Sequence, residues 1–151
     1  PLGAQAGDEL RLVTSNSMAP GNAPEGAAGM VETNVNIAAV TMNGDAITSC
    51  VIDAVQAQVS FDGQGQILTD LSAPVLSKND RGADYGMGAV SSIGKEWNEQ
   101  AAAFAAYVTG KTLDQVAGIA VDEAAKPAEA DLASSVTISI GGFQALLEKL
   151  R

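Results

Sequence analysis

Residues 35–61, VNIAAVTMNGDAITSCVIDAVQAQVSF, carry the strongest strand signal in the chain. Apolar and β-branched residues recur at every second position up to Thr41. The following Asn43-Gly44-Asp45 suits a tight hairpin turn because Asn and Gly tolerate a positive φ. A second run rich in strand-forming residues then extends to Phe61. This pattern predicts two antiparallel strands, over residues 34–42 and 47–60.

The residues after this hairpin predict a third strand and a long connection. Residues 62–66, DGQGQ, are turn-forming, and residues 67–71 suit a short strand. The connection over residues 72–92 contains Tyr85 and Met87, and a loop of this length inside a domain is usually functional or disordered. Two interpretations stay open: the loop covers a flat ligand, or it is a surface loop held by one aromatic residue.

Two later stretches have the period of amphipathic helices. The first covers residues 93–109, with Ser92 as the expected N-cap. The second covers residues 137–150. Between them, Thr112 and Gln115 have the spacing of a capping box and predict a short helix.

Together these elements predict an α+β fold, a small antiparallel β-sheet (a meander) covered by two main helices. The length of 151 residues suits one domain. Residues 1–25 are expected to be a linker or flexible leader, with a short apolar patch at residues 10–13 that suits one small strand. The domain then covers residues 26–151. The residues expected in its core are Val51, Ile52, Trp97, Phe104, Ile140, Phe143 and Leu147.

The composition argues against several classes of function. The net charge is −10 and residues 12–77 contain no Lys or Arg, which argues against binding to nucleic acid or to an anionic membrane surface. The chain has no histidine, which removes histidine-dependent catalysis and histidine-ligated metals. The single cysteine, Cys50, excludes an internal disulfide and a cysteine-cluster metal site, and is expected to be a buried, inert thiol.

Residues 131–137, DLASSVT, carry a resemblance to a known family, which the hairpin around residues 40–48 supports. The chain resembles the FMN-binding domain family over residues 26–150. That family has a motif of Asp, two residues, Ser or Thr, Gly, Ala and Thr, whose last Thr is esterified to the phosphate of FMN. The residues at the motif positions are Asp131, Ser134, Ser135, Val136 and Thr137, so that Ser and Val replace Gly and Ala.

The resemblance implies an electron carrier of the cell envelope or the extracellular space, anchored in the full-length protein, and not an enzyme. FMN is then bound or covalently attached at Thr137, with Ser134 and Ser135 beside it at the start of the last helix and Asp131 positioning the loop. The start of a helix suits a phosphate because its N–H groups are free. The implied partners are a flavin transferase, which attaches the FMN, and a membrane redox protein.

A bound flavin also needs a flat apolar cover, for which Tyr85, Met87 and Trp97 are the candidates. Trp97 has helical spacing, which is more typical of a core residue than of a ligand contact. Lys78 and Arg81 are candidates for stabilising reduced, anionic flavin. Two alternatives stay open, a relative of the family that has lost FMN and an unrelated chain. Either would be a flavin-free surface binding or spacer module of a secreted or anchored protein.

Overall fold

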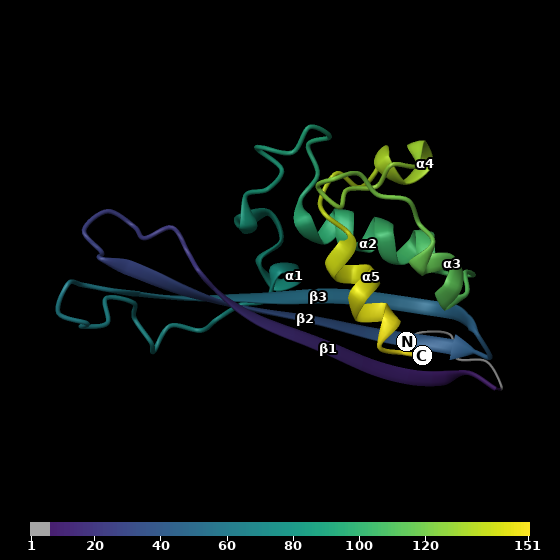
Figure 1. Cartoon of the computed structure of the whole chain (residues 1–151), viewed down its shortest axis with the longest axis horizontal. Helices are drawn as coiled ribbons and strands as arrows, with labels where there is room; N and C mark the ends of the chain where they lie inside the picture. The colour runs from purple at the N-terminus through teal and green to yellow at the C-terminus, as the bar shows by residue number, and fades with distance from the viewer. Residues whose placement is uncertain (1–6) are drawn as a thin grey trace.

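The computed structural model describes residues 7–151, and its centre is a three-stranded antiparallel sheet in the order β1-β2-β3. The strands are β1 (Glu9–Pro20), β2 (Gly29–Asn43) and β3 (Ala46–Phe61). Among the described residues, the helices gather on one side of this sheet (Figure 1). The predicted α+β class is confirmed.

The hairpin that the sequence predicts is formed by β2 and β3. The two strands meet at a tight turn in which Gly44 has a φ of +58°, a conformation that glycine adopts without strain. A register shift between Thr41 and Met42 lies just before the turn. From there the two strands pair without a break to Gly29 and Phe61, so the sheet is longer than the layer of helices that covers it (Figure 1).

The expected leader is largely a strand, so the prediction of a flexible linker is wrong for residues 9–20. All 12 residues of β1 pair with β2, and the domain therefore begins at this strand and not at residue 26. Side-chain contacts hold β1 to the end of the chain, because Arg11 Nη1 donates to the Leu150 carbonyl at 2.9 Å. Residues 1–6 of the expected leader lie outside the described residues.

Residues 67–71 were expected to form a strand, and this is wrong. Ile67 makes only an isolated bridge to Phe61. The Asp70 carboxylate then accepts hydrogen bonds from the backbone N–H and the hydroxyl of Ser72, at 2.9 and 2.6 Å. This local bonding favours a turn over an extended strand.

The helices are shorter than the sequence predicts. Their bounds are α1 (Lys78–Arg81), the 3-10 helix η1 (Gly82–Tyr85), α2 (Trp97–Val108), α3 (Leu113–Ala117), α4 (Ala130–Ala133) and α5 (Gly141–Glu148). Helix α2 begins later than predicted because the Glu99 carboxylate accepts from the Glu96 N–H at 2.8 Å, so Glu96 and not Ser92 precedes the first turn. The predicted capping box of Thr112 and Gln115 at the start of α3 is confirmed.

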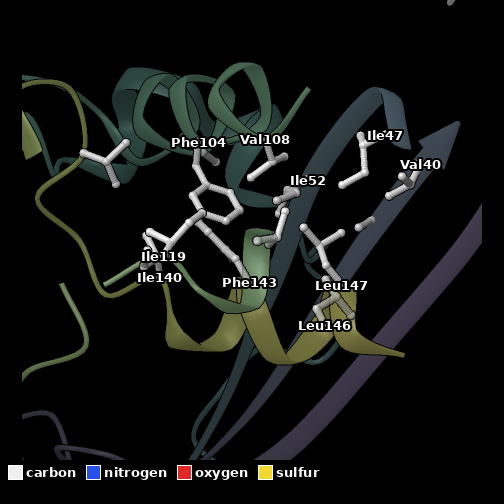
Figure 2. Close-up of a cluster of buried hydrophobic side chains, with 14 of the residues drawn as sticks. Val40, Ile47, Ile52, Phe104, Val108, Ile119, Ile140, Phe143, Leu146 and Leu147 are labelled. Atoms are coloured by element: carbon white, nitrogen blue, oxygen red, sulfur yellow. The ribbon is translucent and has the colours of Figure 1, made fainter. Parts of the chain in front are cut away.

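The core lies between the sheet and helices α2 and α5. Figure 2 shows Phe104 of α2 and Phe143 of α5 among aliphatic side chains from both layers, and their ring centroids are 5.3 Å apart. Six of the seven predicted core residues are buried: Ile52, Trp97, Phe104, Ile140, Phe143 and Leu147. The prediction for Val51 is wrong, because Val51 faces the other side of the sheet from Ile52 and is 47% exposed.

Replacing Phe104 should test this core. Phe104 is fully buried, so we expect Phe104→Ala to lower the free energy of unfolding by about 3–5 kcal/mol. Val90 is 85% exposed, so Val90→Ala should change it by no more than about 0.5 kcal/mol. Urea denaturation followed by circular dichroism measures both, and equal stabilities for the two variants would remove Phe104 from the core.

Candidate ligand pocket

A pocket of about 630 Å³ opens beside the start of α2 and the start of α5. This volume lies within the range of about 300–1,000 Å³ that small-molecule sites occupy. The lining residues are Asn36, Lys78, Met87, Val90, Ser91, Ser92, Trp97, Gln100, Lys126, Thr137, Ile138, Ser139, Gly142 and Phe143.

Gln100, a buried residue of α2, connects the walls of the pocket. Its Oε1 accepts hydrogen bonds from Thr137 N at 2.8 Å, Thr137 Oγ1 at 3.2 Å and Ile138 N at 3.3 Å. Its Nε2 donates to the Lys95 carbonyl at 2.9 Å and to Ser91 Oγ at 3.3 Å. One side chain therefore fixes the loop before α2 and the segment before α5.

The last helix does not begin at residue 137 as predicted, and the residues before it are held by other contacts. The N–H groups of Thr137 and Ile138 are taken by Gln100, and the Ile140 N–H donates to the Ala125 carbonyl at 2.8 Å. Helix α5 starts at Gly141, without a side chain that caps it. Thr137 lies four residues before the helix and is half-buried at the pocket wall.

The apolar lining of the pocket includes two aromatic residues, Trp97 and Phe143, beside Met87, Val90 and Ile138. Trp97 packs edge-on against Phe143, with 5.9 Å between ring centroids and an interplanar angle of 78°. Trp97 is only 5% exposed, so it is both a core residue and part of the pocket wall. Lys78 Nζ lies 5.0 Å from the Trp97 ring centroid and 4.8 Å from that of Tyr85, within the range of a cation–π contact.

The pocket is positively charged, although the chain carries a net charge of −10. Lys78 and Lys126 are the ionisable residues of its lining, which includes no carboxylate. The ion pairs found within residues 7–151 all use arginine, so neither lysine forms a close ion pair there, although Lys78 interacts at longer range with Glu32. Unpaired ammonium groups beside an uncapped helix N-terminus favour an anionic ligand.

The structure brings together some of the residues expected at a flavin site. Thr137, Met87 and Trp97 all line the pocket, together with Lys78. Tyr85 lies beside the pocket lining, and its hydroxyl donates to Gln56 Oε1 at 3.4 Å. The Arg81 guanidinium lies 5.1 Å from the Tyr85 ring centroid, and Arg81 is not one of the lining residues.

Asp131, Ser134 and Ser135 lie outside the pocket lining. Asp131 is exposed on α4. Ser134 Oγ donates to the Asp131 carbonyl at 2.8 Å, and Ser135 Oγ donates to the Leu132 carbonyl at 3.3 Å. The two serine hydroxyls thus bond to carbonyls of α4, and the serines do not lie at the start of the last helix, where they were expected.

Two pocket residues were missed in the sequence. Gln100 follows Trp97 by three positions and precedes Phe104 by four, which places it on the apolar face of the helix. A polar residue on that face indicates a buried hydrogen-bonding role. Lys126 lies in a connector without periodicity. Its place depends on the bridge between Val121 and Pro127, which no local pattern indicates.

Other candidate chemistry is limited. Burial raises the pKa of the half-buried Cys50 thiol to about 12, so this thiol is protonated and unreactive at neutral pH. Within residues 7–151 there is no group of three or more acidic or cysteine side chains that could hold a metal ion. The same part of the chain has no helix with the length and apolarity to cross a bilayer.

No known protein family, curated protein or solved structure matches this chain.

Replacing Gln100 should disconnect the pocket walls. In Gln100→Leu the N–H groups of Thr137 and Ile138 lose their acceptor, and each unsatisfied group costs about 1–3 kcal/mol. We expect a lower free energy of unfolding and faster amide hydrogen exchange at both residues. Gln100→Glu keeps an acceptor oxygen for these N–H groups but loses the donor to the Lys95 carbonyl, so it should retain the exchange protection at Thr137 and Ile138 while still lowering the free energy of unfolding. Unchanged exchange in Gln100→Leu would contradict this role.

Proposed function

We propose that this domain carries flavin mononucleotide in the pocket and transfers electrons between redox partners of the cell envelope. The observation that carries the proposal is the combination of two unpaired lysines with two aromatic residues in one pocket. FMN needs both features, because it joins a charged phosphate to a flat apolar ring.

In this proposal the phosphate lies at the cationic side of the pocket. Both Lys126 and Gly142 belong to the lining, and Gly142 lies in the first turn of α5. Charge-assisted hydrogen bonds from an ammonium group and from free helix N–H groups are the usual means of holding phosphate.

The flavin ring fits the apolar side of the pocket. Met87, Trp97 and Phe143 supply a surface of the flat, polarisable kind that such a ring requires. Lys78 lies against Trp97 and Tyr85, so its ammonium group is held close to this surface. A fixed positive charge there favours the reduced, anionic form of a flavin over the oxidised form.

Thr137 can serve as the attachment point without leaving Gln100 unsatisfied. Transfer from FAD would form a bond between Thr137 Oγ1 and phosphorus, break the pyrophosphate, and release AMP and the hydroxyl proton. Gln100 Oε1 would lose one donor and keep two, the N–H groups of Thr137 and Ile138. Attachment needs a separate flavin transferase, and electron transfer needs a membrane redox partner.

Intact mass spectrometry tests covalent attachment. After co-expression with a flavin transferase and FAD, we expect the wild-type chain to gain the mass of one FMN less one water. Thr137→Ala should abolish the gain and Thr137→Ser should retain it. Ser139→Ala is the matched control, because Ser139 also lines the pocket and should be dispensable. No gain in the presence of a transferase that modifies a known substrate would rule out attachment.

Titration of the unmodified protein tests the phosphate site. Lys126 is exposed, so its interaction with phosphate should be worth roughly 0.5–1 kcal/mol, and Lys126→Gln should weaken FMN binding about 2–5-fold. Binding of riboflavin, which lacks the phosphate, should not change. Lys111→Gln is the control, since Lys111 lies over Tyr107 and away from the pocket lining. Equal losses for FMN and riboflavin would argue against the assignment.

A flavin-free surface module is the second candidate function. It is favoured by the tight packing at the motif, where Val136 is fully buried and the Thr137 hydroxyl is already bonded to Gln100. In that case the pocket would take another anionic ligand, or the domain would be a spacer. The same titration separates the two candidates, because a flavin-free module should bind neither FMN nor riboflavin.

A further inference from the structure

The side of the sheet that faces away from the helices carries more apolar than polar residues, and we propose that a second copy of this chain packs on it. We name this surface the open face. Cross-strand partners share a side, so the register defines its members. Its apolar residues are Leu10, Leu12, Met18, Val31, Val35, Ile37, Ala39, Val51, Val55 and Val59.

The alternation along β2 and β3 shows that the apolar surface is a property of this side. Where the sheet extends beyond the helices (Figure 1), the helix side is polar. On β2 and β3 its residues there are Met30, Glu32, Asn34, Gln56, Gln58 and Ser60, which are polar except for Met30. The open side keeps valines over the same stretch. If both sides of this end of the sheet faced water, valines would not be expected on only one of them.

The open face is accessible along β1, whereas most of its residues on β2 and β3 are half-buried. Leu10, Leu12 and Met18 are 67%, 68% and 74% exposed, and Val51 is 47% exposed. Single exposed apolar residues are ordinary, but a continuous apolar surface on a soluble domain usually marks an interaction site.

Charge favours a second copy as the occupant. Asp53 is the one ionisable residue among the strand positions that the register places on the open face. Its Oδ1 accepts hydrogen bonds from Ala54 N at 2.7 Å and Asn79 N at 3.1 Å, which directs the carboxylate to the edge of β3. Two chains of net charge −10 repel each other over most surfaces, but their open faces can meet without opposing carboxylates.

The area is large enough for a specific dimer. Three strands about 4.8 Å apart and 12 residues spaced by about 3.3 Å give a face of roughly 40 by 14 Å. Two such faces bury on the order of 1,100 Å², which exceeds the threshold of about 1,000 Å² for a biological interface. Stacked sheets of this kind pack about 10 Å apart.

The face is a better contact than the free edge of β1. Lys149 Nζ donates to the Thr14 carbonyl at 2.6 Å, near the middle of that strand. A lysine at this place obstructs the addition of another strand along the edge. Face-to-face packing leaves Lys149 in place. Face-to-face packing also leaves the ligand pocket of each copy open, because the pocket lies on the helix side of the sheet.

Sedimentation equilibrium tests the proposal on the intact chain. At about 0.1 mM protein, we expect the wild-type chain to have about twice its monomer mass of 15.2 kDa. Leu12→Lys and Val51→Lys each place a charge on the open face and should give monomers. Val90→Lys, a change of the same kind at an exposed site outside this face, should remain dimeric. Circular dichroism shows whether each variant is folded.

Several outcomes would overturn the second copy as the occupant. A folded wild-type monomer at this concentration is one, and a dimer that survives both open-face substitutions is another. A wild-type monomer that binds uncharged phosphatidylcholine vesicles, with binding lost in Leu12→Lys, would assign the face to lipid. If Leu12→Lys does not fold, Val51→Lys decides, because Val51 is already half-exposed.

Discussion

The pocket depends on the buried amide of Gln100. An amide taken out of water without partners would cost several kcal/mol, so its position in the core is tolerable only because both ends are bonded. Those bonds run to Thr137 and Ile138 on one side and to Ser91 and the Lys95 carbonyl on the other. The hydrogen bonds that satisfy Gln100 are therefore the same ones that hold two separate loops at the pocket.

The same hydrogen bonds also decide where Thr137 lies. The hydrogen bonds to Gln100 hold Thr137 at the pocket wall, four residues before the last helix. Helix α5 then starts at Gly141 with free N–H groups next to the same pocket. Lys78, on the short helix α1 at the edge of β3, brings a positive charge to the aromatic side. The pocket therefore depends on residues from four separate regions of the chain.

The sequence predicted what local patterns determine. Alternation across Asn43-Gly44 was enough for β2 and β3, and the capping box was enough for α3. It failed for β1, because residues 9–20 become a strand only when the edge of β2 is available to them. It failed for Val51 because both sides of β3 are apolar, and periodicity cannot say which side the helices cover. Thr137, Met87 and Trp97 were found, whereas Lys126 depends on tertiary contacts.

The distribution of charge connects the pocket to the open face. An excess of carboxylates over most of the surface keeps copies of the chain apart and repels anions at long range. The two exceptions lie on opposite sides of the sheet: a pocket with two unpaired lysines, and a face whose one carboxylate is directed to its edge. At physiological ionic strength, charges more than about 8 Å apart are largely screened, so contacts at these two places are decided by the groups that line them. A ligand bound on one side and a partner packed on the other therefore need not compete.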